Sequence, residues 1–175
     1  FRRYFRVSFK DQTLIVMDAP PQQEDCTPFL QVAEILAATG VHVPKIVAQN
    51  LDQGFLLLSD LGDTTFLQAL NNQMDSADQL YGDAIDALIK LQLSQQVEGL
   101  PGYDEALLLR ELNLFPDWYV AKHLRVAITE KQQAVLQSIF TRIIQNNIAQ
   151  PRVLVHRDYH SRNLMVTSPN PGIID

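Results

Sequence analysis

Chemically active side chains crowd one short stretch of the sequence, from His156 to Asn163. The segment reads HRDYHSRN and lies between the apolar runs 153–155 and 164–166, which we predict to be two short strands. A polar loop of this length between buried strands is seldom needed for chain connection alone. An Asp followed five positions later by an Asn fits a phosphoryl-transfer loop, in which the Asp orients a substrate hydroxyl and the Asn ligates magnesium.

A second carboxylate ligand is expected at Asp175. Mg²⁺ takes hard oxygen ligands, and the phosphate charge of ATP has to be neutralised. Asp175 ends the apolar run that follows a turn made by residues 169–172. We therefore predict Asp158 as the catalytic base, Asn163 and Asp175 as metal ligands, and ATP with Mg²⁺ as cofactors.

Each residue of the loop also has a purely structural interpretation. A His-x-Asp pair alone more often forms a structural hydrogen bond than a catalytic group, and it is the addition of Asn163 and Asp175 that favours catalysis. His156 is expected to hold the loop by hydrogen bonds. His160 either lines the site or faces solvent, and the sequence leaves both alternatives open.

Composition narrows the class of protein. The chain has 175 residues, 46% of them hydrophobic, with a net charge of −6 and a pI near 5.1. Its basic residues are scattered, which argues against nucleic acid as a partner. The single cysteine, Cys26, permits neither an intramolecular disulfide nor a cysteine zinc cage. No apolar run reaches the roughly 18 residues that span a bilayer, so we expect a cytoplasmic protein without a membrane partner.

Two groups of elements are predicted to position the loop. Residues 1–60 read as a β-rich, nucleotide-binding N-lobe. Its strands and helix are indicated by alternating residues in 4–9, the β-branched run 13–17, a helix between Pro28 and Gly40, and short strands at 45–48 and 55–58.

The remaining residues, 61–175, read as a helical C-lobe that contains the catalytic loop. Ser76 is predicted to cap one helix, and Thr129 with Gln132 has the spacing of a capping box ahead of another. The segment 103–125 is predicted to be helical but interrupted by Pro116. Because Phe1 opens within a strand and Asp175 ends an apolar run, we expect a chain truncated at both ends, with an incomplete C-lobe.

This order of elements, with its catalytic loop, resembles the aminoglycoside phosphotransferase and choline kinase group. His160, two positions after Asp158, favours this group over protein kinases, which usually carry a Lys there. The resemblance covers the whole chain and implies an α+β, two-lobed protein-kinase-like fold. Five long stretches are similar to the amino-sugar kinases of bacterial cell-wall recycling within this group: FRRYFRV, MDAPPQQEDC, GFLLLSDLGD, YDEALLLRELNLFPDWY and VHRDYHSRNLMVTSPNPGIID. This narrower likeness implies transfer of phosphate to the anomeric C1 hydroxyl of N-acetylmuramate or N-acetylglucosamine.

The resemblance also implies roles for residues outside the loop. The backbone of Ser59, Asp60 and Leu61 would form the hinge that binds adenine. Arg2 and Arg3 would contact ATP phosphates, or else are solvated charges on an edge strand. The acceptor pocket would draw on the helical insert, where the candidates are Glu111, Asp117, Trp118 and Tyr119, although core packing explains the two aromatic residues almost as well.

One position departs from the pattern of the group. Kinase-like lobes usually carry a Lys or Arg on the third strand, paired to a helix Glu, and this chain has Met17 there although Glu34 is available as the partner. Met17 is the best argument for a rival interpretation, a nucleotide-binding pseudokinase, while the intact Asp158 and Asn163 argue against it. The other rival is a kinase for another hydroxyl, that of an aminoglycoside, choline or homoserine. The oligomeric state stays open.

Overall fold

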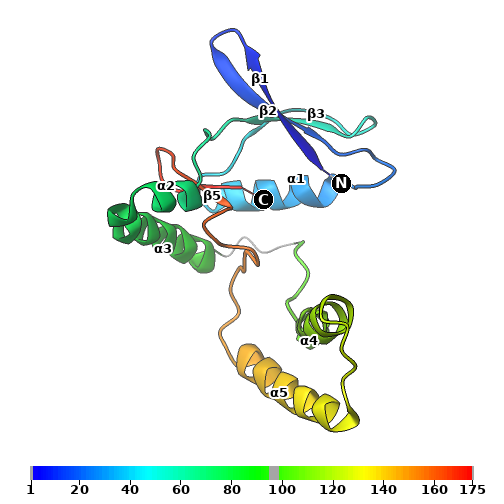
Figure 1. Ribbon diagram of the computed structural model, residues 1–175. Helices are drawn as coiled ribbons and strands as arrows, with labels where there is room; N and C mark the ends of the chain where they lie inside the picture. The colour runs from blue at the N-terminus through cyan, green and yellow to red at the C-terminus, as the bar shows by residue number, and fades with distance from the viewer. Residues whose placement is uncertain (1, 95–98, 175) are drawn as a thin grey trace. The chain divides into compact units, whose positions relative to one another are not determined.

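The computed structural model describes residues 2–94 and 99–174 (Figure 1). The chain divides into two compact units, the first made of residues 1–98 with 153–175 and the second of residues 99–152. The catalytic loop belongs to the first unit, and the helical insert to the second. The lobe boundary expected near residue 60 divides the chain in another way and stays a prediction.

A four-stranded antiparallel sheet forms the N-terminal part of the first unit. Its strands lie in the order β1 (Arg3–Phe9), β2 (Gln12–Asp18), β4 (Phe55–Ser59) and β3 (Ile46–Asn50). The hairpin predicted from the alternating pattern is confirmed, because β1 and β2 pair along their whole length. Lys10 makes the turn between them with a positive φ of 55°.

Helix α1 (Thr27–Ala38) lies across one face of this sheet (Figure 1). Pro28 in its first turn and Gly40 just beyond its end, with φ at 79°, confirm the predicted helix. Phe29 and Leu30 of the helix pack against a buried core made of Met17, Ala19, Cys26, Leu56 and Leu58.

Gly54 lies where the turn before β4 approaches this core. Its φ is 75°, and a Cβ atom there would lie 2.0 Å from the carbonyl oxygen of Ala19. The Ala19 amide donates a hydrogen bond to the Gly54 carbonyl at 2.8 Å. Both the backbone conformation and the close approach therefore require glycine.

Three helical segments follow the sheet in the first unit: α2 (Phe66–Asn72), the 3₁₀ turn η1 (Met74–Ser76) and α3 (Ala77–Leu93). The prediction that Ser76 caps a helix is wrong. Ser76 has helical backbone angles, and its hydroxyl donates to the Gln73 carbonyl at 2.8 Å. Ser76 does precede the first residue of α3, as predicted, but its side chain bonds within the η1 turn and makes no capping hydrogen bond to α3.

A two-stranded ladder follows the catalytic loop. Strand β5 (Leu164–Met165) pairs with β6 (Gly172–Ile173), so the predicted strand at 164–166 is confirmed in its first two residues. The strand predicted at 153–155 is wrong, because those residues have no strand conformation. The nearby hairpin supplies the hydrogen-bonding partner for β5, and of the three earlier residues only Leu154 is buried.

The second unit is helical. It contains α4 (Glu105–Leu114), the π-helix η2 (Phe115–His123) and α5 (Glu130–Ile148). The interruption predicted at Pro116 is confirmed, since α4 ends two residues before it and the chain continues in the wider π form. The Thr129 capping box is also confirmed: its hydroxyl accepts from the Gln132 amide at 3.3 Å, and its own amide donates to the Gln132 side chain at 2.9 Å.

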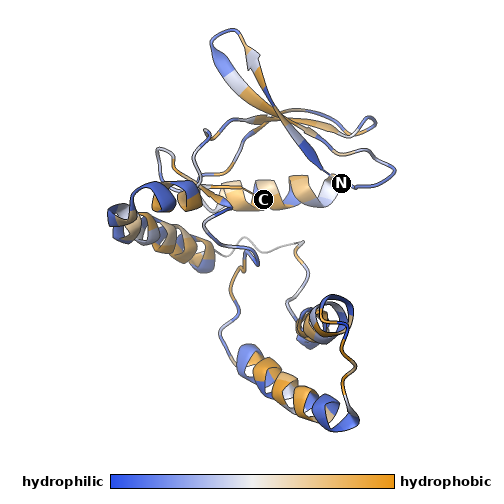
Figure 2. Ribbon diagram, in the orientation of Figure 1, coloured by the Kyte–Doolittle hydropathy of each residue, from blue (hydrophilic) through white to orange (hydrophobic). Residues whose placement is uncertain are grey.

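Apolar residues concentrate in the middle turns of α5, with hydrophilic residues at both ends (Figure 2). Phe140 and Ile144 are the buried residues of that helix. In the described part of the chain, no helix combines the length and the apolar character needed to cross a membrane.

Candidate active site

Asp158 and Asn163 are in direct contact within the polar loop. The Asn163 side-chain amide donates to the Asp158 carboxylate, with Nδ2 to Oδ2 at 2.9 Å, and also to the Asp158 main-chain carbonyl at 3.1 Å. The Asp158 side chain stays 63% exposed. The structure thus brings the predicted base and one predicted metal ligand together and leaves the carboxylate accessible to a substrate.

His160 lies against the same carboxylate. Its Nε2 is 3.1 Å from Oδ1 of Asp158, and its Nδ1 accepts from the Arg162 amide at 3.2 Å. Because the Arg162 amide is a donor, Nδ1 must be the unprotonated nitrogen and Nε2 the one that donates to Asp158. His160 therefore contacts the predicted base while its side chain stays 47% exposed.

Tyr159 anchors the loop to helix α3. Its hydroxyl donates to the Ala84 carbonyl at 2.7 Å, and the ring of His156 meets the Tyr159 ring edge-on at 5.4 Å. Burial raises the pKa of Tyr159 to about 12, so the hydroxyl remains a donor at neutral pH. Arg157, which lies between these two residues in the sequence, has a φ of 76°, a rare conformation for a residue with a side chain.

Two backbone hydrogen bonds join the second half of the loop and the strand after it to residues at the start of α2. The Leu67 amide donates to the Ser161 carbonyl, and the Val166 amide to the Thr64 carbonyl, each at 2.9 Å. Thr65, which caps α2 through a capping box with Gln68, forms a β-bridge with Met165. The catalytic loop is therefore held by a segment that lies far away in the sequence.

The expected metal ligands are only partly within the described residues. Asp175 lies outside them. The residue before it, Ile174, donates its amide to the Asn163 carbonyl at 2.9 Å, so the chain leading to Asp175 runs beside Asn163. No group of three or more His, Cys, Asp or Glu side chains within residues 2–94 and 99–174 converges to hold a metal ion.

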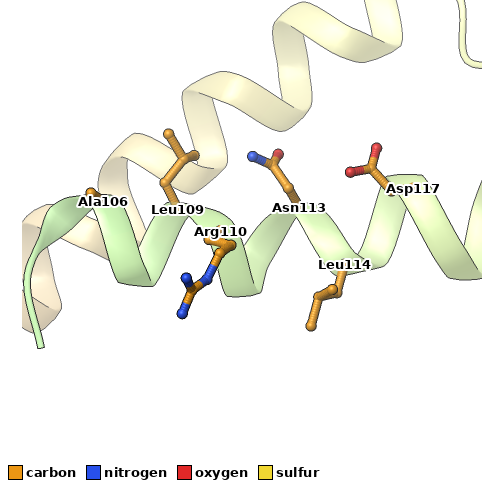
Figure 3. Close-up of a pocket in the computed structure, with 6 residues that line it drawn as sticks. All are labelled: Ala106, Leu109, Arg110, Asn113, Leu114 and Asp117. Carbon is orange, nitrogen blue, oxygen red and sulfur yellow. The ribbon is translucent and has the colours of Figure 1, made fainter. Parts of the chain in front are cut away.

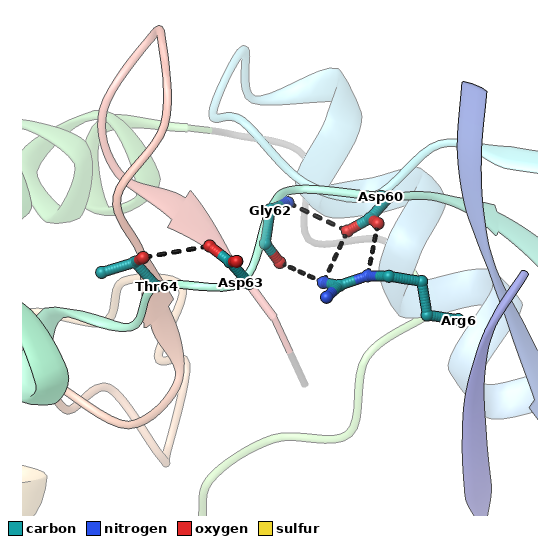
Figure 4. Close-up of polar contacts among 5 residues, drawn as sticks. All are labelled: Arg6, Asp60, Gly62, Asp63 and Thr64. Carbon is teal, nitrogen blue, oxygen red and sulfur yellow. Dashed lines mark hydrogen bonds and ion pairs between the residues drawn. The ribbon is translucent and has the colours of Figure 1, made fainter. Parts of the chain in front are cut away.

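The predicted hinge residues follow strand β4. Ser59 is used in the sheet, since its amide donates to the Lys45 carbonyl at 2.9 Å and its hydroxyl accepts from the Lys45 amide at 2.8 Å. The Asp60 carboxylate accepts hydrogen bonds from Nε and one terminal nitrogen of Arg6, at 2.7 and 3.1 Å (Figure 4). Leu61 is half-buried.

The two arginines proposed for the phosphates already have carboxylate partners. Arg2 forms an ion pair with Glu24 at 2.8 Å, and Arg3 forms one with the buried carboxylate of Asp18. Burial works to lower the pKa of Arg2, but the hydrogen bond and the charge of Glu24 outweigh it and raise the pKa. A phosphate contact by either guanidinium would have to compete with these pairs.

Met17 occupies its strand position as a core residue, with an exposed fraction of 0%. Glu34, its expected partner on α1, is exposed instead and lines a hollow of about 510 Å³ between α1 and β3. Lys45 lines the same hollow. Met17 therefore serves packing, and the helix carboxylate points to a different part of the lobe.

The predicted acceptor residues all lie in the second unit. Glu111 accepts a hydrogen bond from the Tyr103 hydroxyl. Tyr119 stacks between Phe115 and His123, with ring centroids 5.7 and 5.5 Å away, and Lys122 Nζ lies 3.5 Å from the Trp118 ring centroid.

Two of these aromatic side chains are exposed. Trp118 is 58% exposed and Tyr119 is 51% exposed. Asp117 lines a shallow hollow of about 450 Å³ along α4, with Arg110 and Asn113 (Figure 3). The hollow thus presents a cation, an amide and a carboxylate between leucine side chains.

A model of the phosphotransferase enzyme family matches residues 1–175. The chain belongs to this family. Among curated relatives, the N-acetylmuramate/N-acetylglucosamine kinase of Pseudomonas aeruginosa is 54% identical over 175 residues, and the kinase of the same name from Pseudomonas putida is 51% identical. Both matches cover 100% of this phosphotransferase chain and 51% of the relative. The chain therefore spans about half the length of the curated relatives it matches.

Solved structures show the fold of the chain. The ternary complex of APH(2")-IIa with streptomycin and ATP matches 99% of the chain and 64% of its own length, with a TM-score of 0.62 and 16% identity. A choline/ethanolamine kinase family protein from Mesorhizobium loti matches 99% and 57%, with a TM-score of 0.62 and 14% identity. The predicted kinase-like α+β fold, and the resemblance to the aminoglycoside phosphotransferase and choline kinase group, are confirmed.

Two residues of the site were missed by sequence reasoning. Arg6 was noticed only as a polar residue of an alternating strand, and Tyr159 only as part of the loop. For Tyr159 a signal existed, because an aromatic residue inside a catalytic loop needs a place to bury its ring. For Arg6 no local signal existed, because its partner Asp60 lies 54 positions away.

Proposed function

We propose that the full-length protein is an ATP-dependent sugar kinase that phosphorylates the anomeric C1 hydroxyl of N-acetylmuramate and N-acetylglucosamine in the cytoplasm, as part of peptidoglycan recycling. The observation that carries the chemistry is the exposed Asp158 carboxylate, held through one oxygen by Asn163 at 2.9 Å. The names of the relatives at 54% and 51% identity support the choice of acceptor.

Asp158 would act as the base. Its carboxylate can accept the proton of a sugar hydroxyl while Asn163 and His160 hold it in one orientation, so the hydroxyl oxygen is presented to the γ-phosphate in line. Such transfer needs little covalent help from the protein, and positioning accounts for most of the catalysis. The hinge backbone at Ser59, Asp60 and Leu61 would bind adenine, and Arg2 and Arg3 remain the proposed phosphate contacts.

The donor set fits magnesium. The Asn163 amide nitrogen is committed to Asp158, which leaves Oδ1 as the hard oxygen of that side chain, and the backbone beside Asn163 leads directly to Asp175. Asn163 and Asp175 would hold the ion. When bound, magnesium supplies charge neutralisation for the phosphate oxygens.

The acceptor residues proposed are Glu111, Asp117, Trp118 and Tyr119. A sugar presents an apolar face and a rim of hydroxyls, and exposed indole and phenol rings beside a carboxylate suit both. Trp118 and Tyr119 are exposed, which leaves both rings available for such a contact.

The test is a coupled ADP-release assay on the full-length protein with N-acetylmuramate, N-acetylglucosamine, choline, homoserine and an aminoglycoside as separate acceptors. Turnover is expected with the two amino sugars only. Turnover confined to one of the other acceptors would replace the proposal with a kinase for that compound. Measurable ATP binding without turnover on any acceptor would instead identify a pseudokinase.

A further inference from the structure

Arg6 on strand β1 binds the segment 60–62, which follows strand β4. The Arg6 Nε and one terminal nitrogen contact both oxygens of Asp60 at 2.7 and 3.1 Å, and the same terminal nitrogen donates to the Gly62 carbonyl at 2.6 Å (Figure 4). The Gly62 amide donates back to Asp60 at 2.9 Å. A single guanidinium therefore fixes both the side chain and the backbone of this turn.

The register of the sheet explains why this residue is an arginine. Arg6 pairs with Ile15 across β1 and β2, and Ile15 pairs with Leu58 across β2 and β4. Arg6 thus lies two strand spacings, about 10 Å, from Leu58, and Asp60 follows two residues later. Only a long side chain crosses β2, and a planar fork is needed to bind two carboxylate oxygens together.

The contact is electrostatically strong on the Asp60 side. The Asp60 side chain is 6% exposed, whereas that of Arg6 is 44% exposed. Burial works to raise the pKa of Asp60, but hydrogen bonds from Arg6, the Gly62 amide and the Thr13 side chain, together with the charge of Arg6, outweigh it and lower the pKa. Asp60 is therefore ionised at neutral pH and needs a cation.

The turn at residues 60–62 connects the sheet to the segment that contacts the catalytic loop. Thr64, two residues beyond Gly62, accepts the Val166 amide at 2.9 Å, and Thr65 bridges Met165 in the strand that follows Asn163. Because residues 64 and 65 are held to β5 by these contacts of their own, a shift confined to residues 60–62 would move the hinge and leave the strand beside the catalytic residues in place.

We propose that Arg6 is a positioning residue for the nucleotide, which clamps residues 60–62 in the conformation that binds the base of ATP. This inference rests on the proposed function, because that function assigns the hinge to adenine. Arg6 acts through Asp60 and Gly62 and not by touching the reacting atoms.

The experiment measures ATP affinity of the full-length protein by calorimetry without sugar, and then kcat and both KM values. Arg6→Gln is expected to weaken ATP binding about tenfold, with kcat at saturating ATP and the KM for sugar within about twofold of wild type. Arg6→Lys should be intermediate, because a point charge keeps the attraction but loses the fork. Asp60→Asn combined with Arg6→Gln should bind ATP no worse than Arg6→Gln alone, as expected for two residues that act as one unit.

Lys10→Gln is the matched control, since Lys10 is a cation of the same hairpin that contacts only the Phe9 ring in the described part of the chain. It should bind ATP as wild type does. Unchanged ATP affinity in Arg6→Gln would overturn the proposal. A variant with a lower kcat, a lower melting temperature and both KM values raised to a similar extent would also overturn it, because that pattern indicates a purely structural role. If the wild type binds ATP but phosphorylates no sugar, the proposed acceptor is wrong. The role of Arg6 is still tested in that case, by comparing the ATP affinities of wild type and Arg6→Gln.

Discussion

The Asp158 carboxylate combines exposure with a fixed orientation. Asn163 and His160 each contact one of its oxygens, at 2.9 and 3.1 Å, and the side chain is still 63% exposed. A base that must meet a diffusing substrate needs both properties, because it has to be reachable and it has to present one lone pair in a constant direction.

Replacing Asp158 by Asn keeps the shape and removes the proton acceptor. We expect Asp158→Asn to lower kcat by more than roughly tenfold, a barrier increase of at least about 1.4 kcal/mol, while ATP affinity stays near wild type. Coupled ADP release and calorimetry measure the two quantities. Asp86→Asn, at an exposed position of α3, should change neither. Retention of more than about a tenth of the wild-type kcat would show that Asp158 is not the base.

Tyr159 gives a prediction on stability. Tyr159→Phe removes the bond to the Ala84 carbonyl and should cost about 1 kcal/mol in the free energy of unfolding. Because the folded-state pKa of Tyr159 is raised to about 12, above its ordinary value near 10, this contribution is full below about pH 10 and is lost as the pH rises through 12.

Denaturant unfolding of wild type and Tyr159→Phe between pH 8 and about pH 11 measures the difference. The gap between the two proteins should narrow above about pH 10. Tyr81→Phe is the control. Tyr81 lies on α3, the helix that Tyr159 contacts, but it is 48% exposed and should show no such gap. A gap that stays constant over this pH range would contradict the buried phenol as its source.

Among the elements, those whose signals are local were predictable. The Thr129 capping box, the Pro28 helix start and the stop at Gly40 each depend on residues a few positions apart, and all are confirmed. Ser76 failed because the same residue type also favours a 3₁₀ turn, and the turn at 74–76 prevailed. The strand predicted at 153–155 failed because its existence depended on a partner, and β5 pairs with β6 instead.

Thr129 and Ser76 give a prediction that compares two variants. Thr129→Ala should lower the free energy of unfolding by about 1 kcal/mol, because the Gln132 amide at the start of α5 loses the Thr129 hydroxyl as its hydrogen-bond partner. Ser76→Ala should cost less, about 0.5 kcal/mol or below, because Ser76 satisfies no helix amide. Denaturant titration of both variants compares them directly, and equal losses would refute the distinction.

For the whole molecule, the fold was predictable and the spatial partners were not. The kinase-like fold follows from the order of elements and from long matching stretches of sequence. The Arg6 pair with Asp60 depends on three strands lying in register, and that register appears only once the sheet is built. For a pair of this kind, the sequence around either residue contains no signal that identifies its partner.

The acceptor is also a question for the whole molecule. If C1 of the sugar is the site of transfer, 1-deoxy-N-acetylglucosamine should be a competitive inhibitor and not a substrate, because it can bind but has no hydroxyl to accept phosphate. The 6-deoxy sugar should still turn over. Steady-state kinetics with each analogue measures this, and phosphate transfer to the 1-deoxy sugar would exclude anomeric specificity whatever the roles of the catalytic residues.

The hydrogen bonds from Leu67 to Ser161 and from Val166 to Thr64 have a consequence for synthesis on the ribosome. The whole second unit, residues 99–152, is translated between the two sides of these bonds. At roughly 5–20 residues per second, the start of α2 waits several seconds for its partner strand. During that interval the Thr64 carbonyl and the Leu67 amide have not yet met their partners in the chain.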